Sequence, residues 1–473
     1  MYTTIIDIQK ALSSGTTCVE ILDYFINRID NQNQLNVFLE VFKESAQKQA
    51  RHVDEKIKNN TQGKLAGVVI AIKDNLCYKG HKVSAASKIL EGFESIYTST
   101  AVQRLIDEDA IIIGRVNCDE FAMGGSNENS AYGPVLNAEN VECVPGGSSG
   151  GSAVAVQSGM CIASLGSDTG GSIRQPASFT GTIGFKPTYG SISRHGLIAY
   201  ASSFDQIGTF TNCIKDSVVL YNIMHGPDEF DSTCIQNKKE IDVAKLNNSK
   251  QLTVGVIADY NNASGLDPEI KKSIDSLIVK LKEDGAELKE FSFPFLEALV
   301  PTYYVITTAE ASSNLSRFDG VHYGYRSPNS NGLQDTYVKS RSEGFGVEVK
   351  RRIMAGTFVL SHGYYDAYFT KAQKVRRLLK DQTEDIMANC DVVIMPTTIS
   401  TAFKIGDVKD PVAMYLQDKF TVHANLSGNP AISIPLDVHS NGLSYGLQVM
   451  ADQSCEKMLF FASKKIENLL NTQ

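Results

Sequence analysis

The sequence predicts an α/β protein with a mixed central sheet that helices cover on both faces. Three observations lead to this prediction. Short apolar runs of strand length alternate along the chain with segments of helical periodicity. Several of these runs are apolar at every position, which is typical of strands buried on both faces. The length of 473 residues suffices for a large core, which could form one large domain or two to three smaller ones.

The N-terminal region, about residues 1–60, is predicted to be helical. Apolar residues recur there at the spacing of one helix face, at Leu22, Phe25, Ile26 and Ile29. Thr16 or Thr17 is a suitable N-cap for the helix that carries them. We therefore expect helices over about residues 16–58.

A core region is predicted over about residues 64–212. Its apolar runs and periodic segments alternate, which indicates strands connected by helices in a mostly parallel arrangement. We expect strands at residues 68–72, 110–113 and 162–165, and helices at 99–109 and 149–158. Ser172 is expected at the start of the next turn or helix.

The C-terminal part, about residues 250–473, is predicted to complete the sheet and the single domain of residues 1–473. A polar connection over about 226–250 precedes it, and residues 323–344 resemble a long surface loop. The expected strands are 252–257, 391–395, 432–434 and 443–450. The expected helices are 267–284, with Ile270, Ile274, Leu277 and Leu281 on one face, and 456–470.

Composition excludes several function classes. The net charge of −8 argues against nucleic acid as the principal ligand of this chain. Nine scattered cysteines, with no Cys-x-x-Cys pair, favour reduced thiols in a cytoplasmic protein over disulfides or zinc. The eight histidines are dispersed as well, so we expect no metal. The N-terminus does not resemble a signal peptide, and no apolar run is long enough to span a membrane.

Two Gly/Ser loops are the main candidate for chemistry. Residues 145–152 read Pro-Gly-Gly-Ser-Ser-Gly-Gly-Ser, and residues 166–176 read Gly-Ser-Asp-Thr-Gly-Gly-Ser-Ile-Arg-Gln-Pro. Such segments are most often flexible loops. A phosphate loop is excluded because no Gly-Lys-Ser/Thr follows Ser148. A serine nucleophile needs a base, and no histidine lies between Ser148 and Ser172. The candidate base is Lys73, which ends the apolar run 67–72, although a lysine at a strand end is ordinarily a solvated charge.

The combination of Lys73, Ser148 and Ser172 in these loops resembles the amidase signature family. The resemblance implies a Ser–Ser–Lys triad, with Ser172 as nucleophile, Ser148 on a cis peptide as proton relay, and Lys73 as base. Lys73 can act only when neutral, which burial favours. Backbone N–H groups of Thr169, Gly170 and Gly171 would stabilise the oxyanion.

Asp168 and Arg174 flank the nucleophile. We expect them to brace the loop through an ion pair or backbone hydrogen bonds rather than to take part in catalysis.

Further segments resemble the branch of this family that supplies ammonia to tRNA-dependent amidotransferases. They are residues 184–190, 193–197, 201–208, 310–315, 348–353 and 425–431. The resemblance implies hydrolysis of glutamine to glutamate and ammonia. Ammonia would pass to a partner, the B subunit, which uses ATP and Mg²⁺ to amidate Glu-tRNA(Gln), and a small C subunit would complete a heterotrimer. No cofactor is expected in this chain itself.

Free glutamine carries a carboxylate and an ammonium, so its pocket needs an arginine and an acidic residue. The resemblance assigns the arginine to Arg352, with Arg351 as the second choice, and the acidic residue to Asp418. Tyr304, or its neighbour Tyr303, would close the pocket. Two other functions remain open: a stand-alone amidase acting on small amides through the same triad, and a scaffold protein with a silent site, against which the intact triad argues.

Overall fold

The structure is a computed structural model that describes residues 1–237, 239–247 and 251–471. Positions 238 and 248–250 of the predicted polar connection, and the last two residues of the predicted domain, lie outside the described residues. The sheet has the order β1-β3-β2-β4-β6-β5-β10-β11-β9-β7-β8. Its strands are β1 Phe38–Val41, β2 Val69–Lys73, β3 Ile111–Val116, β4 Ala163–Asp168, β5 Ile183–Lys186, β6 Gln206–Thr211, β7 Thr253–Ile257, β8 Glu287–Phe291, β9 Val392–Pro396, β10 Ala431–Val438 and β11 Ser444–Ala451.

The predicted mixed sheet is confirmed, but the expectation of mostly parallel pairing is wrong. Among the described strands, six of the ten pairings are antiparallel. The reason is that β10 and β11 form a hairpin in the middle of the sheet, and β5 and β6 pair antiparallel beside it. The parallel pairs lie toward the two ends, among β2, β3 and β4 and among β7, β8 and β9.

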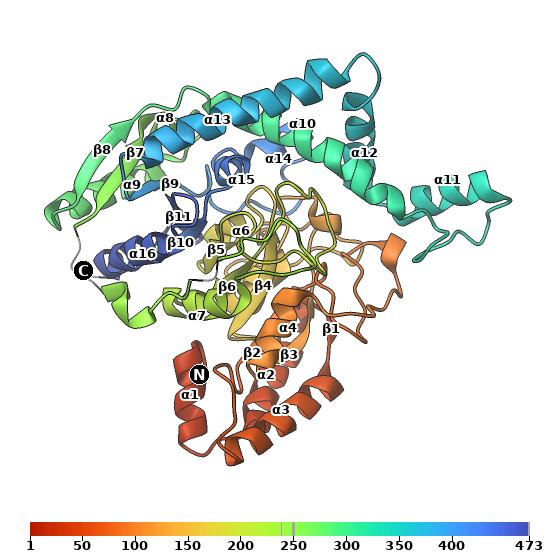
Figure 1. Ribbon diagram of the computed structural model, residues 1–473, viewed down its shortest axis with the longest axis horizontal. Helices are drawn as coiled ribbons and strands as arrows, with labels where there is room; N and C mark the ends of the chain where they lie inside the picture. Colours follow the sequence, from red (N-terminus) through yellow and green to blue (C-terminus); the bar gives the residue numbers. More distant parts are fainter. Residues whose placement is uncertain (238, 248–250, 472–473) are drawn as a thin grey trace.

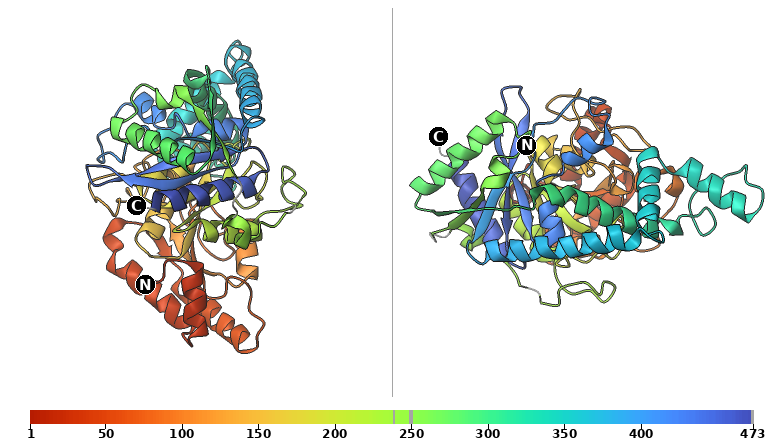
Figure 2. Two further views of the ribbon diagram at one scale, coloured as in Figure 1. Left: turned by 90° about the vertical axis from the view of Figure 1, so that its left-hand side faces the viewer. Right: turned by 90° about the horizontal axis from the view of Figure 1, so that it is seen from above.

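Helices lie on both faces of this sheet (Figures 1 and 2). The α-helices are α1 Ile5–Ser13, α2 Cys18–Asn31, α3 Lys43–Lys58, α4 Thr100–Asp107, α5 Gly150–Gln157, α6 Arg174–Phe179, α7 Ile214–Met224, α8 Ala258–Asn261, α9 Pro268–Glu283, α10 Leu296–Asn314, α11 Leu333–Gly344, α12 Val347–Val359, α13 Lys371–Met387, α14 Pro411–Leu416, α15 Val422–Ser427 and α16 Glu456–Asn471. Short helical turns at 33–35, 88–90, 120–122, 243–247, 315–317 and 366–370 connect them.

Strand β9 shows how the two faces are covered. Its side chains alternate between the faces, as in any strand. Val392 and Ile394 belong to a core cluster that includes residues of α9 and α16. Val393 and Met395 belong to a second cluster that includes residues of α10 and α13. The all-apolar strand pattern therefore arises, as predicted, from burial on both faces.

Two predicted segments differ from the structure. Residues 323–344, expected to be a surface loop, contain helix α11, which projects from the body at the right of Figure 1. Leu333 and Val338 of α11 are exposed and only Ser340 and Gly344 are buried, so the helix has no apolar stripe that a pattern could reveal. The helical region 16–58 is interrupted by strand β1, which pairs with β3 at the edge of the sheet.

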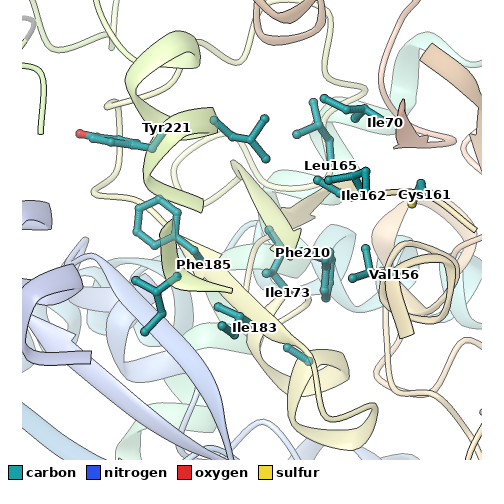
Figure 3. Packing of buried hydrophobic residues seen from close by; sticks show 14 of the residues in the cluster. Ile70, Val156, Cys161, Ile162, Leu165, Ile173, Ile183, Phe185, Phe210 and Tyr221 are labelled. Carbon is teal, nitrogen blue, oxygen red and sulfur yellow. The ribbon is translucent and has the colours of Figure 1, made fainter. Parts of the chain in front are cut away.

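The fold brings the two Gly/Ser loops and Lys73 to one edge of the sheet. Strands β2 and β4 are parallel neighbours, with Ile72 opposite Leu165, so their carboxyl ends lie together. Ligand sites of open α/β sheets form outside such ends. Ile173, the residue after Ser172, is fully buried in the core near Phe210 (Figure 3). Its burial fixes the position of the serine that precedes it.

Candidate active site

Lys73 is the last residue of β2 and is completely buried. Its Nζ lies 2.7 Å from Ser148 Oγ, 2.9 Å from Ser149 Oγ and 3.0 Å from Ser167 Oγ. Ser148 and Ser149 come from the first Gly/Ser loop, and Ser167 comes from β4. Lys73 therefore connects the first loop to the strand that leads into the second.

The neighbours of Lys73 determine how its neutral amine is oriented. Ser149 Oγ donates its proton to the carbonyl oxygen of Ser167 at 3.1 Å, so it accepts a hydrogen bond from Lys73. Ser167 Oγ accepts from Asn75 Nδ2 at 2.9 Å and also from Lys73. A neutral amine has two N–H groups and one lone pair. When the two N–H groups point to Ser149 and Ser167, the lone pair faces the hydroxyl of Ser148.

The pKa of Lys73 fits this neutral state. Burial lowers the pKa of its ammonium to about 8, although Cys118 and the carboxylates of Asp119, Asp168 and Asp205 act in the opposite direction. A substantial fraction of the amine is therefore unprotonated near neutral pH. The chemistry available to the group is the acceptance of a proton from Ser148.

The two Gly/Ser loops meet through their backbones. The peptide bond between Gly147 and Ser148 is cis, as the resemblance predicts. The N–H of Ser149 donates to the carbonyl oxygen of Ser172 at 3.3 Å, which brings Ser172 beside the first loop. Within the described residues the Ser172 hydroxyl makes no hydrogen bond, so the expected bridge from Ser148 to Ser172 is not formed. Ser172 is 8% exposed, and its Oγ changes direction by rotation about one bond.

Asp168 and Arg174 brace the second loop, as the sequence predicts. Arg174 Nη2 lies 2.9 Å from Asp168 Oδ1, and both side chains are completely buried. Asp168 also accepts the N–H groups of Gly171 at 2.8 Å and Ile173 at 3.2 Å. Burial alone would raise the pKa of Asp168, but the Arg174 guanidinium and hydrogen bonds lower it to about 2. The carboxylate therefore stays charged and holds the backbone on both sides of Ser172.

Arg174 also joins this loop to the C-terminal part of the chain. Its Nη1 donates to the carbonyl oxygen of Thr421 at 2.8 Å and to Gln448 Oε1 at 2.6 Å. Its Nη2 donates to Asn425 Oδ1 at 2.6 Å. Because a guanidinium offers five donors in a fixed plane, one side chain can orient α15 and β11 against the serine loop.

The expected oxyanion hole differs in part from the structure. The N–H of Gly171 is already engaged by Asp168, and Thr169 uses its hydroxyl to bond Asp205 Oδ1 at 2.7 Å. In the described part of the chain, the N–H groups of Thr169, Gly170 and Ser172 make no hydrogen bond. These three N–H groups are the donors that the loop leaves available for a developing oxyanion.

The glycines of this loop are required by close neighbours. A Cβ at Gly170 would lie 2.5 Å from the hydroxyl oxygen of Tyr303. A Cβ at Gly171, whose φ is +131°, would clash with Thr421 Oγ1. Thr421 Oγ1 in turn donates to the carbonyl oxygen of Gly170 at 2.7 Å. Tyr303 and Thr421 thus pack directly on the loop, and any side chain at either glycine would displace them.

Arg352 lies on helix α12 and is 4% exposed. Its Nε donates to Glu348 Oε1 at 2.8 Å, and its Nη1 donates to the hydroxyl of Tyr200 at 2.9 Å. The guanidinium carbon lies 5.2–5.6 Å from the ring centres of three tyrosines, Tyr200, Tyr304 and Tyr415. No described residue accepts a hydrogen bond from Nη2, so its two N–H groups remain for an anion.

Asp418 is linked to this arginine through Tyr304. The Tyr304 hydroxyl donates to Asp418 Oδ2 at 2.8 Å, and the Arg352 guanidinium lies over the same tyrosine ring. Burial raises the pKa of Asp418 to about 7, although the Tyr304 hydrogen bond and the charge of Arg352 lower it. Tyr304 also stacks on Tyr415, with ring centres 4.0 Å apart. The structure therefore brings the predicted cation, anion and tyrosine together around one ring.

A cavity of about 310 Å³ lies on the Arg352 side of this group, and Asp418 and Tyr304 are not among its lining residues. Its lining includes Arg352 and Glu348 of α12, Met414 and Tyr415 of α14, and Ser126 of the loop before the first Gly/Ser segment. Arg351, the second choice from the sequence, lies at its edge and is more exposed than Arg352. The volume suits a small polar molecule rather than a polymer.

Several residues of the site were not identified from the sequence. Ser149, Ser167 and Asn75 surround Lys73, and Tyr200 and Tyr415 surround Arg352. Ser149 and Ser167 lie within the two Gly/Ser segments, and Asn75 follows Lys73 by two positions. Tyr415 precedes Asp418 by three positions, whereas Tyr200 comes from a segment far from Arg352 in the sequence. No local pattern marks any of the five as a site residue. Across the described residues, no group of three or more His, Cys, Asp and Glu side chains is arranged to hold a metal ion, and no helix there could cross a membrane.

Comparisons with known proteins agree with the geometry. The family model described as Amidase matches residues 20–460. A protein of Fusobacterium nucleatum subsp. nucleatum, named as the A subunit of glutamyl-tRNA(Gln) amidotransferase, is 48% identical over 464 residues, covering 97% of this chain and 94% of that protein. A protein of Chlorobium phaeobacteroides with the same name is 47% identical, with 94% of each chain covered. The crystal structure of the A subunit of glutamyl-tRNA(Gln) amidotransferase from Thermotoga maritima matches with a TM-score of 0.78 and 36% identity, over 97% of this chain and 92% of that one.

Proposed function

This chain belongs to the amidase family, and we propose that it is the glutamine-hydrolysing A subunit of a glutamyl-tRNA(Gln) amidotransferase. Relatives of that name are 47–48% identical to it over nearly its whole length. The observation that carries the proposal is the pairing of Arg352 and Asp418 around Tyr304, because this pairing offers one site for each charge of free glutamine.

The proposed reaction begins with attack of Ser172 Oγ on the side-chain amide carbon of glutamine. The Ser172 proton passes to Ser148, while Ser148 gives its own proton to the Lys73 amine, which is 2.7 Å away. The free N–H groups of Thr169, Gly170 and Ser172 stabilise the negative oxygen of the tetrahedral intermediate. Collapse of this intermediate breaks the C–N bond, and the nitrogen takes the proton back from Lys73 through Ser148 to leave as ammonia.

The second half of the reaction hydrolyses the resulting ester between Ser172 and the glutamyl group. A water molecule attacks the ester carbon and transfers its proton along the same path to Lys73. The proton then returns to Ser172 as the C–O bond breaks, and glutamate leaves. Atoms balance overall, because glutamine and water give glutamate and ammonia.

Glutamine is selected by its two charges in this proposal. Its carboxylate binds the free N–H pair of Arg352 Nη2, and Glu348 and Tyr200 hold the guanidinium plane in place. Its ammonium binds the Asp418 carboxylate, whose pKa falls once a cation is adjacent to it. Tyr304 contacts both groups and separates the pocket from solvent.

The partners follow from the same proposal. Relatives are named as subunits, which supports a complex with other amidotransferase chains. We propose that ammonia passes to a B subunit, which consumes ATP with Mg²⁺ and binds Glu-tRNA(Gln), and that a small C subunit makes the complex a heterotrimer. This chain would need no cofactor of its own. Since the product is used in translation, the proposed location is the cytoplasm.

The experiment compares glutamine with butyramide, a small amide that lacks both charges. We expect Asp418→Asn and Arg352→Lys, assayed in the complex with its partner chains, to lower kcat/KM for glutamine by about 10²-fold or more, since an unpaired buried charge costs several kcal/mol. Butyramide hydrolysis should change by less than about threefold, because it uses neither side chain.

The matched control makes the same substitutions in an exposed ion pair, Arg377→Lys and Asp381→Asn on α13, where Arg377 Nε lies 2.6 Å from Asp381 Oδ1. These variants should match the wild type on both substrates. Equal losses on glutamine and butyramide in the pocket variants would contradict the proposal and favour a stand-alone amidase for small amides.

A further inference from the structure

Two consecutive acidic residues, Asp119 and Glu120, lie between the two halves of the site. Asp119 faces the first Gly/Ser loop. Its N–H donates to the carbonyl oxygen of Ser148 at 3.0 Å. Its carboxylate accepts the N–H groups of Asn127 at 2.9 Å and Asn129 at 3.0 Å. A Cβ at Gly147 would clash with Asp119 Oδ2, so this carboxylate packs directly on the peptide that precedes Ser148.

Glu120 faces the other way, toward helix α12. It is 2% exposed. The N–H of Gly346, the N-cap of α12, donates to both of its carboxylate oxygens, at 3.1 Å and 2.9 Å. The Ser87 hydroxyl donates to Glu120 Oε1. A Cβ at Gly346 would clash with Glu120 Oε2, so the carboxylate and the start of the helix are in direct contact.

Helix α12 carries the arginine of the pocket. Arg352 lies six positions after Gly346, which corresponds to about 9 Å along the helix axis. Over this distance an α-helix moves as a rigid unit, so a shift at its first turn is transmitted to Arg352. Phe345, which directly precedes the cap, packs on Phe121 with ring centres 5.7 Å apart. The same short segment, residues 119–121, therefore contacts both the serine loop and the start of α12.

We propose that Glu120 is a positioning residue that fixes α12 relative to the Ser148 loop and thereby sets the distance from Arg352 to the nucleophile. Asp119 contacts the peptide of Ser148, and Glu120 contacts the helix that carries Arg352. These two adjacent residues therefore align the proposed proton-relay serine with the arginine that binds the substrate carboxylate. This inference rests on the proposed use of glutamine as substrate.

A carboxylate is well suited to this role. It accepts the first free N–H of the helix and lies at the positive end of the helix dipole. A carboxylate also offers two oxygens, so it accepts from Gly346 and Ser87 at once. An amide at this position would keep one oxygen for these donors, and an alanine would keep none.

The test measures kcat and KM for glutamine and for butyramide in the complex with its partner chains. We expect Glu120→Ala to raise KM for glutamine by about 10- to 100-fold, since a displacement of about 1 Å at a binding group has effects of that size. Its kcat/KM for butyramide should fall by less than about threefold, because butyramide does not contact Arg352. Glu120→Gln should be intermediate on glutamine, because one acceptor oxygen remains.

The matched control is Asp216→Ala. Asp216 is another buried carboxylate at a helix start, since it accepts the N–H of Ile5, the first residue of α1, at 3.0 Å. A general loss of stability would affect both variants alike, whereas a positioning role predicts that only Glu120 variants change the ratio of glutamine to butyramide activity.

Equal losses on both substrates in Glu120→Ala, or the same change of ratio in Asp216→Ala, would overturn the inference. If Glu120→Ala does not fold, Glu120→Gln serves as the test. An unchanged ratio of glutamine to butyramide activity in Glu120→Gln would also overturn the inference. Failure of the proposed function can be distinguished from failure of the Glu120 inference. In the former case the wild-type complex would hydrolyse butyramide but not glutamine, and both proposals would be withdrawn.

Discussion

The titration of Lys73 should control the rate of hydrolysis between about pH 6 and 10. In the proposed reaction only the neutral amine can accept a proton from Ser148, so kcat follows the unprotonated fraction of Lys73. Burial lowers the pKa of this ammonium to about 8. The sign is therefore fixed: activity is low below this pKa and rises as the pH passes through it.

The size of the effect follows from the same pKa. With a pKa of about 8, about a tenth of Lys73 is neutral at pH 7 and about nine tenths at pH 9, so kcat should rise about tenfold over this interval. An exposed lysine with its ordinary pKa of about 10.4 would be neutral in less than about 0.1% of molecules at pH 7. Burial thus increases the active fraction at neutral pH by about 10²-fold.

Butyramide is the substrate for this assay. Asp418 has its pKa raised by burial to about 7, so the binding of glutamine would add a second rise near that pH as the carboxylate becomes charged. Butyramide has no ammonium and avoids this contribution. The measurement is kcat for butyramide across the pH range in the complex, with a check that the protein remains folded at each pH. A rate that is constant between about pH 7 and 9, or a midpoint near the ordinary pKa of about 10.4, would contradict the control of kcat by a buried Lys73 with a lowered pKa.

Two substitutions test the proposed triad directly. Ser172→Ala should abolish glutamine hydrolysis. Free ammonium should still support tRNA amidation by the complex, because only the ammonia supply is lost. Glutamine hydrolysis at the wild-type level by this variant would remove Ser172 from the mechanism. Lys73→Arg keeps a positive charge but cannot lose its proton near neutral pH, so kcat should fall by more than the ~10²–10⁴-fold usual for one proton-transfer group, since Lys73 also holds Ser148 in place. Substantial turnover by that variant, measured by ammonia release, would show that a neutral lysine is not required.

Sequence and structure agree best where chemistry and local pattern coincide. Lys73 follows an apolar strand segment, and Ser148 and Ser172 lie in glycine-rich loops with no competing histidine. The sequence predicted strands β2 and β4 but not their pairing; the structure shows that they are parallel neighbours, so their carboxyl ends meet. The order of the C-terminal strands was not predictable in this way, since the β10–β11 hairpin pairs with β5 and β9 over long sequence separations.

The proposed glutamine pocket shows the limit of sequence reasoning. Arg352 could be chosen over Arg351 only through family resemblance, because both are charged residues in one helix. The structure separates them: Arg352 is buried under the rings of Tyr200 and Tyr415, and Arg351 is exposed. These rings come from positions 152 residues before and 63 residues after the arginine. Side-chain contacts of this kind depend on the whole fold, so the local spacing of residues in the sequence does not predict them.

The serine loop shows why a motif alone does not assign each atom its role. A Gly-Gly pair suggested that Gly171 donates its N–H to the oxyanion, yet Asp168 accepts that N–H at 2.8 Å. Asp168 stays charged because Arg174 lowers its pKa to about 2, so this hydrogen bond persists over the pH range in which Lys73 titrates. The same ion pair therefore removes one donor from the oxyanion site and rigidifies the segment that presents Ser172. Preorganisation of the nucleophile and the number of oxyanion donors are consequently coupled through one buried carboxylate.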